Sequence, residues 1–141
     1  MIFALALASN KSPELNFKKA IEQIKQIGET QFSQIYLIPC RDGVGADYWN
    51  AGCLVRSDLN VDEMTQLLKK MEFDSGRIRP SHQISLDVDL IAWGENLNHM
   101  QFNPKKLPLA LDVKIPMKDL WNHELFINNK NDSFKVIASM K

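Results

Sequence analysis

Apolar and polar positions alternate with clear periods in the first third of the chain. Residues 2–8 form a continuous apolar run, which predicts a short strand buried on both faces within a sheet. From Phe17 to Ile27 apolar residues recur every three or four positions with charged and amide residues between them, which predicts an amphipathic helix. Pro13 suits the first turn of this helix and Gly28 suits its end.

Two further strands are predicted in the middle of the chain. Residues 32–39 read as a strand, and the polar residues 41–47 read as a loop after it. A third strand is expected over residues 48–56, where strict alternation places Tyr48 and Asn50 on the same face.

A second helix and a fourth strand complete the pattern. Asn60 and Glu63 have the spacing of a capping box, and the apolar residues after them predict a helix over residues 61–73. Residues 84–92 then alternate as a strand that carries Asp87 and Asp89 on one face.

The order of these elements is βαββαβ, which predicts an α+β fold of the ferredoxin-like sandwich type. In this fold two helices cover one face of an antiparallel sheet, and we expect the other face to be free. We expect one domain over residues 1–141, with a core at 1–94 and a short irregular extension at 95–141. That extension carries several prolines and a candidate small strand at residues 134–138.

Composition excludes several classes of protein. Seventeen Lys and Arg balance 17 Asp and Glu, so a protein that coats nucleic acid or an anionic membrane is not expected. The apolar run at residues 2–8 is too short to cross a bilayer. Cys40 and Cys53 have no zinc-ligand spacing and are expected to be idle thiols. These features indicate a soluble cytoplasmic protein. The neutral total charge conceals local charge. Residues 69–82 sum to +2, and residues 83–101 directly after them sum to −3.

The Asp87-Val88-Asp89 sequence is the most informative chemical feature. Strand alternation places both carboxylates on one face, roughly 7 Å apart along the strand, where their mutual repulsion requires a cation. Magnesium binds carboxylate oxygens and keeps positions open for substrate phosphates. The alternative is that both side chains lie on the solvated face of an edge strand.

Candidate binding residues lie on either side of the acidic pair in the sequence. Arg77 and Arg79 follow Gly76 and Glu72, and such guanidinium groups can close over phosphate oxygens, or can simply be solvated. Asn50 offers a donor and an acceptor suited to the edge of a pterin or a purine, or it can bond local backbone.

Four segments, in this order, resemble the family of 6-hydroxymethyl-7,8-dihydropterin pyrophosphokinases. They are Ala6-Leu7-Ala8-Ser9-Asn10, Tyr48-Trp49-Asn50-Ala51, Glu72 with Gly76-Arg77-Ile78-Arg79, and Ser85-Leu86-Asp87-Val88-Asp89-Leu90-Ile91. The resemblance covers about residues 2–94 and implies the same ferredoxin-like fold. It also implies transfer of the β,γ-pyrophosphoryl group of MgATP to the hydroxymethyl oxygen of the pterin, with release of AMP, in folate biosynthesis.

The resemblance implies a role for each site residue. Asp87 and Asp89 would bind two magnesium ions, Arg77 and Arg79 would meet the ATP phosphates, and Glu72 would lie beside the nucleotide. In the second substrate pocket, Asn50 would bond the pterin edge and Tyr48 would shape the pocket, while the backbone around Ile38 and Pro39 would help to line it.

The sequence also departs from the family pattern. His82-Gln83-Ile84 stands where the family has a Gly-Pro-Arg stretch, and the later Pro-His and Arg-Phe segments are not found. Two hypotheses therefore stay open: a divergent working pyrophosphokinase, or a catalytically impaired paralogue that binds nucleotide, pterin or a protein partner.

Overall fold

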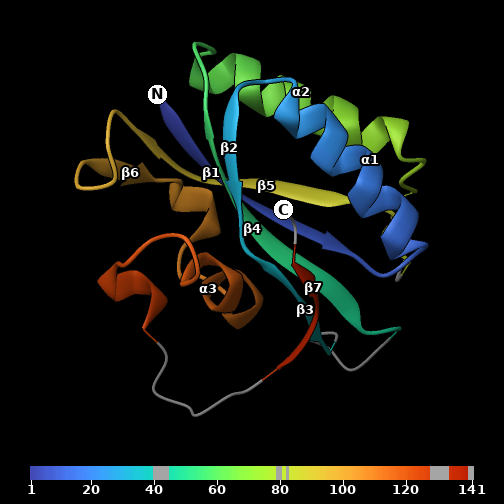
Figure 1. Ribbon diagram of the computed structural model, residues 1–141. Helices are drawn as coiled ribbons and strands as arrows, with labels where there is room; N and C mark the ends of the chain where they lie inside the picture. Colours follow the sequence, from blue (N-terminus) through green and yellow to red (C-terminus); the bar gives the residue numbers. More distant parts are fainter. Residues whose placement is uncertain (40–44, 79–80, 82, 128–133, 140–141) are drawn as a thin grey trace.

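An antiparallel sheet forms the centre of the computed structural model, which describes residues 1–39, 45–78, 81, 83–127 and 134–139. The strand order is β6-β5-β1-β4-β3-β7, and β2 pairs with β4 beside β3 (Figure 1). In chain order the elements are β1 (Ile2–Ser9), α1 (Pro13–Lys25), β2 (Glu29–Phe32), β3 (Gln34–Ile38), β4 (Tyr48–Arg56), α2 (Val61–Asp74), β5 (Asp87–Gly94), β6 (Met100–Phe102), η1 (Pro104–Lys106), α3 (Leu111–Met117), η2 (Glu124–Phe126) and β7 (Lys135–Ser139), where η marks a 3₁₀ helix.

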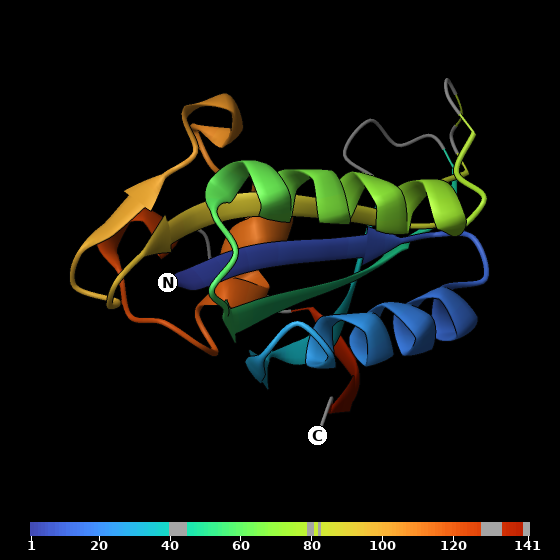
Figure 2. The same cartoon turned by 90° about the horizontal axis from the view of Figure 1, so that it is seen from above.

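Helices α1 and α2 pack on one face of the sheet and run along it on either side of β1 (Figure 2). Their apolar faces meet the inward side chains of the strands in one continuous core that includes Phe3, Leu5, Phe17, Met64 and Val88. The predicted ferredoxin-like α+β fold is confirmed, because the alternating and helical patterns place these residues on the faces that become buried.

The strand predicted at residues 32–39 is in fact two strands that break at Ser33. The Ser33 hydroxyl accepts a hydrogen bond from the backbone N–H of Gly52 at 2.7 Å, and the Ser33 N–H donates to the Gly52 carbonyl at 3.0 Å. This local pairing interrupts the regular ladder with β4 and separates β2 from β3. Strand β2 also begins earlier than predicted, at Glu29.

The second face of the sheet is covered in part, so the expectation that it is free is wrong. A second core joins apolar residues of β1, β4 and β5 to residues of the segment 109–126, including Leu109, Met117, Trp121 and Phe126. Figure 1 shows α3 on the opposite side of the sheet from α1 and α2. The segment after Gly94 is therefore more regular than expected: it forms β6, two 3₁₀ helices, α3 and β7, and β7 is offset by one residue from the predicted small strand.

The predicted fourth strand begins three residues later than expected, at Asp87. Asn10 holds Ile84 from both sides, since its N–H donates to the Ile84 carbonyl at 2.9 Å and its side-chain oxygen accepts from the Ile84 N–H at 2.6 Å. Strand β6 pairs only with residues 92–94 of β5. Among the described residues, the first half of β5 therefore lies at an edge of the sheet, with β1 as its strand partner.

The remaining expectations from composition concern membrane spans and thiols. None of the described helices is both long and apolar enough to cross a bilayer. Cys53 is buried, and that burial raises the pKa of its thiol, as expected for an idle group. Cys40 lies outside the described residues.

Phe126→Ala tests whether the second core contributes to stability. The Phe126 side chain is fully buried, so its removal should lower the free energy of unfolding by about 3–5 kcal/mol in urea denaturation. Phe73→Ala is the matched control, because Phe73 is 80% exposed and its loss should cost less than about 0.5 kcal/mol. Equal, small effects of both changes would show that the second core does not support the fold.

Candidate active site

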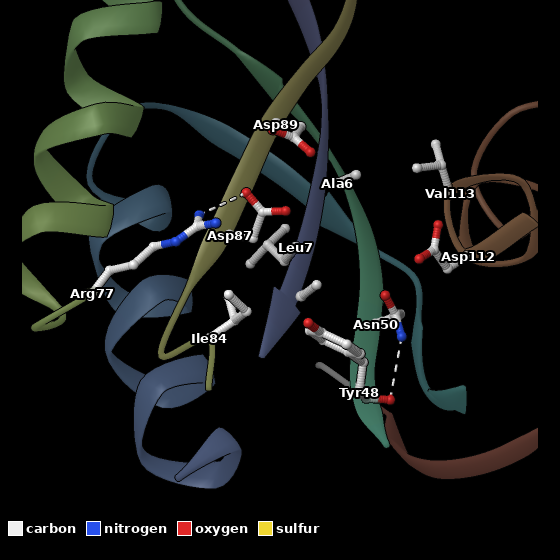
Figure 3. A pocket seen from close by; sticks show the side chains of 11 residues that line it. Ala6, Leu7, Tyr48, Asn50, Arg77, Ile84, Asp87, Asp89, Asp112 and Val113 are labelled. Atoms are coloured by element: carbon white, nitrogen blue, oxygen red, sulfur yellow. Dashed lines mark hydrogen bonds and ion pairs between the residues drawn. The ribbon is translucent and has the colours of Figure 1, made fainter. Parts of the chain in front are cut away.

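A cavity of about 260 Å³ opens where the end of β1 meets the beginnings of β4 and β5. Figure 3 shows Asp87 and Asp89 on β5, Asn50 and Tyr48 on β4, and Asp112 and Val113 on α3 facing this space from the other side. The described residues that line the cavity are Ala6, Leu7, Ala8, Tyr48, Asn50, Arg77, Ile84, Asp87, Asp89, Asp112 and Val113.

Three carboxylates converge beside this cavity. Asp87 and Asp89 project from the same face of β5, and one oxygen each from Glu72, Asp87 and Asp89 lie within 4.8 Å of one another. Glu72 reaches the pair from the last turn of α2, where its Oε2 accepts the Val88 N–H at 2.9 Å. The unpaired edge of β5 thus offers a backbone donor that holds Glu72 next to the aspartates.

The predicted capping box fixes the beginning of the helix that carries Glu72. The Asn60 side chain accepts the Glu63 N–H at 2.8 Å, and the Glu63 carboxylate accepts the Asn60 N–H at 3.0 Å. At the other end Gly76 adopts a positive φ of 85°, a left-handed conformation in which glycine avoids the strain of a side chain. The chain reverses there and returns Arg77 to the acidic cluster.

Arg77 joins two of the three carboxylates. Its Nη1 donates to Glu72 Oε2 at 3.1 Å, to Asp87 Oδ1 at 3.0 Å and to the Leu86 carbonyl at 3.3 Å. The side chain is only 11% exposed, so the alternative of a solvated loop arginine is wrong for Arg77. Arg79 lies outside the described residues.

Lys106 approaches the cluster from the opposite direction. Its Nζ lies 2.9 Å from Asp89 Oδ1, in a pair whose side chains are 36% and 28% exposed. Both aspartates therefore have a cationic partner within the chain, Arg77 for Asp87 and Lys106 for Asp89. The alternative of two aspartates on a simply solvated strand face does not describe this arrangement.

The environment shifts the proton affinity of two of these acids. Burial is the main cause that raises the pKa of Glu72 to about 7. A hydrogen bond with Asp87 and the charge of Asp87 also raise this pKa, whereas the Val88 N–H and the charge of Arg77 lower it. Burial is likewise the first cause that raises the pKa of Asp89; the Asp87 charge adds to it, and Lys106 opposes it. The cluster therefore holds more negative charge than its surroundings readily stabilise.

The donor set fits a hard divalent cation. Carboxylate oxygens are the protein ligands that Mg²⁺ prefers, and Mg²⁺ usually binds through one or two carboxylates together with substrate phosphates. Asp87 and Asp89 present such oxygens to the cavity, with Glu72 within reach. A cation at this position would compete with the ion pairs that Arg77 and Lys106 form.

Asn50 makes the local backbone bond that was one of its two predicted roles, and it also lines the cavity. Its side chain is buried, and its Nδ2 donates to the Tyr48 carbonyl at 3.2 Å, which is the local backbone bond. Its oxygen is also exposed to the cavity (Figure 3). Ile38 pairs with Tyr48 between β3 and β4, but neither Ile38 nor Pro39 is among the described residues that line the cavity.

Sequence reasoning missed three residues at this site: Asp112, Val113 and Lys106. All three come from the segment after Gly94, whose weak periodicity gave no indication that it would pack against the open face of the sheet. The two lysines after Asn103-Pro104 were the only indication of a site residue in this segment, and they belong to no helical or strand pattern.

The fold and the site together define an α+β sandwich with an acidic, magnesium-type cluster beside an arginine. The chain matches the sequence model of the 7,8-dihydro-6-hydroxymethylpterin-pyrophosphokinase family over residues 4–130 of its 141 residues. The protein belongs to this family, as the ordered motifs predicted, and the match extends well beyond the last of those motifs. No curated protein matches the chain.

Glu72→Gln tests the shifted pKa of Glu72 through the stability of the metal-free protein. Between pH 4.5 and 7 the folded state keeps the Glu72 proton that the unfolded state loses, so this group's contribution to stability falls as pH rises through that window. Gln mimics the protonated acid without titrating. Urea unfolding gives the free energy of unfolding at each pH in this range. This free energy should fall less steeply with pH in the variant than in wild type, whereas equal slopes in both proteins would contradict the raised pKa.

Proposed function

We propose that this protein transfers the β,γ-pyrophosphoryl group of MgATP to 6-hydroxymethyl-7,8-dihydropterin as a step in folate biosynthesis. The observation that carries the proposal is the convergence of Glu72, Asp87 and Asp89 beside a cavity that also presents Arg77 and Asn50. Family membership supports the same reaction. We place it in the cytoplasm, with small molecules as the partners.

The proposed reaction forms one bond and breaks one. The hydroxymethyl oxygen of the pterin attacks the β-phosphorus of ATP, and the bond from that phosphorus to the α,β-bridging oxygen breaks. AMP leaves with the bridging oxygen, and the hydroxyl proton is released. Such transfers depend mainly on positioning and on stabilisation of the phosphate charge, which are the tasks the residues of the cavity would perform.

Asp87 and Asp89 are the proposed metal ligands, with Glu72 beside them. When bound, two Mg²⁺ ions would neutralise phosphate charge and lower the pKa of the attacking hydroxyl. The backbone of β5 supports this role, because it presents both aspartates from one strand face and holds Glu72 through the Val88 N–H. The raised pKa of Glu72 means that this carboxyl also loses its proton near neutral pH.

Arg77 is the proposed phosphate ligand on the loop after α2. Its Nη1 now binds Asp87 and Glu72, at the position where the phosphates of a metal-bound nucleotide would compete for it. The Nε of Arg77 is buried and has no hydrogen-bond partner among the described residues, which leaves donor capacity for a phosphate oxygen once the side chain moves. Arg79 is proposed for the same task on the strength of the family motif.

Asn50 and Tyr48 are the proposed pterin ligands on β4. Since the Nδ2 of Asn50 is used by the Tyr48 carbonyl, the amide oxygen remains as an acceptor for an N–H on the pterin edge. Tyr48 would shape the same pocket. The backbone around Ile38 and Pro39 is proposed to help to line it on the strength of the family resemblance alone, since Ile38 pairs with Tyr48 but neither residue lines the described cavity.

The second candidate is a catalytically impaired paralogue that binds nucleotide, pterin or a protein partner. Two observations favour it: His82-Gln83-Ile84 stands where the family has a Gly-Pro-Arg stretch, and Asp87 and Asp89 are already neutralised by cations of the chain itself. The assay that follows separates the two candidates.

Release of AMP in the presence of Mg²⁺, ATP and 6-hydroxymethyl-7,8-dihydropterin tests the proposed reaction. Wild type should release AMP only when pterin is present, and Asp87→Asn or Asp89→Asn should lower the rate by about 100-fold or more, because each removes a charged metal ligand. Asp58→Asn, which changes an exposed aspartate away from the cavity, should keep the wild-type rate.

Thermal unfolding of each variant identifies any change that merely unfolds the protein. If folded wild type releases no pterin-dependent AMP above the Asp89→Asn rate, the enzyme proposal is wrong. Calorimetry with a non-hydrolysable ATP analogue then decides the second candidate: Mg²⁺-dependent binding that Asp87→Asn abolishes would support a nucleotide-binding paralogue.

A further inference from the structure

The short helix η1 is tied directly to the strand that carries the aspartates. The N–H of Asn103 donates to the Ile91 carbonyl at 2.8 Å, and its side-chain Nδ2 donates to the Leu90 carbonyl at 2.9 Å. The side-chain oxygen of Asn103 also caps η1 by accepting the Lys105 N–H at 3.1 Å. One residue thus anchors the beginning of η1 to the two positions that follow Asp89.

This anchor directs Lys106 to Asp89. The Lys106 N–H closes η1 on the Asn103 carbonyl at 3.0 Å, and the Lys106 Nζ reaches Asp89 Oδ1 at 2.9 Å. Lys105, its neighbour in the same helix, is exposed. The two lysines therefore differ in placement. Of these two, only Lys106 forms an ion pair with the acidic cluster in the described part of the chain.

A second cavity of about 260 Å³ lies between η1 and α3. It shares Asp89 and Val113 with the first cavity, so the two spaces are neighbours at these two residues. Its described lining residues are Asp89, Ile91, Lys105, Lys106, Leu107, Pro108, Ala110 and Val113. A polyphosphate held by a cation at Asp89 would therefore have space beside the ammonium group of Lys106.

We propose that Lys106 is an exchangeable counter-ion of Asp89, which a divalent cation displaces and which then binds a phosphate oxygen of the nucleotide on that cation. This inference rests on the proposed function and adds to it a binding residue from the segment after Gly94. The ammonium group would move from the Asp89 carboxylate to a phosphate oxygen, and no covalent change is involved.

The exposure of the ion pair allows this exchange. A partly solvated ion pair contributes little to stability, so a divalent cation that binds Asp89 together with Asp87 can replace it. The lysine chain is flexible and carries three donors on a compact charge, so the released Nζ can turn to an adjacent phosphate. Arg77 is held by more contacts than Lys106, because its side chain is 11% exposed and its Nη1 makes three hydrogen bonds.

Calorimetry on Lys106→Met tests the proposal, with Mg²⁺ alone and then with a non-hydrolysable ATP analogue at saturating Mg²⁺. The control is Lys19→Met, which changes an exposed lysine of α1 outside both cavities. Titrations at about pH 8 favour ionised carboxylates. Lys106→Met should bind Mg²⁺ alone about two- to five-fold more tightly, because its competitor is gone. The same variant should bind the Mg²⁺-loaded analogue about ten-fold more weakly, because a charged donor to phosphate is lost.

Opposite changes in the two affinities separate this role from a structural one. Lys19→Met should match wild type in both titrations, and Lys106→Arg should restore binding of the analogue. If Lys106→Met weakens both affinities or leaves both unchanged, the exchange is wrong.

The proposed function can fail independently. If wild type binds Mg²⁺ but not the Mg²⁺-loaded analogue, the pyrophosphokinase proposal and the phosphate contact of Lys106 are both overturned. The titration with Mg²⁺ alone still decides whether Lys106 is the counter-ion of Asp89: tighter binding by Lys106→Met supports that role, and unchanged or weaker binding overturns it.

Discussion

Repulsion among Glu72, Asp87 and Asp89 is the constraint on which the rest of this structure depends, because their carboxylate oxygens lie within 4.8 Å of one another. Like charges at this distance destabilise a fold unless protons, cations or donors offset them. The chain uses all three. Glu72 has a raised pKa and accepts a hydrogen bond from the Val88 N–H, Arg77 pairs with Asp87, and Lys106 pairs with Asp89. Under the proposed function, Mg²⁺ and phosphate would take the place of these cationic partners.

Each part of the fold contributes one element of this balance. The first half of β5 is not paired by β6, so its backbone N–H at Val88 can hold Glu72 at the end of α2. The turn at Gly76 returns Arg77 to the cluster, and Asn103 attaches η1 to β5. Segments distant in sequence thereby meet at one edge of the sheet, with α3 closing the cavity from the far side (Figure 3).

Local patterns in the sequence were sufficient to predict much of this site. Alternation placed Asp87 and Asp89 on one strand face, and the capping box located the helix that carries Glu72. The covering of the second sheet face could not be predicted in this way, since α3 is short and contains Pro116, so its periodicity is weak. The Lys106 ion pair was equally hidden, because it depends on tertiary hydrogen bonds of Asn103 and not on any repeat.

Crystals soaked with Mn²⁺ and a non-hydrolysable ATP analogue would test the central claim most directly, through the anomalous signal of manganese. Mn²⁺ prefers the same hard oxygen ligands as Mg²⁺. The account predicts manganese in contact with Asp87 and Asp89, with Arg77 and Lys106 turned from these carboxylates to the phosphates. Bound nucleotide with no manganese at the aspartates, and with both ion pairs intact, would contradict it.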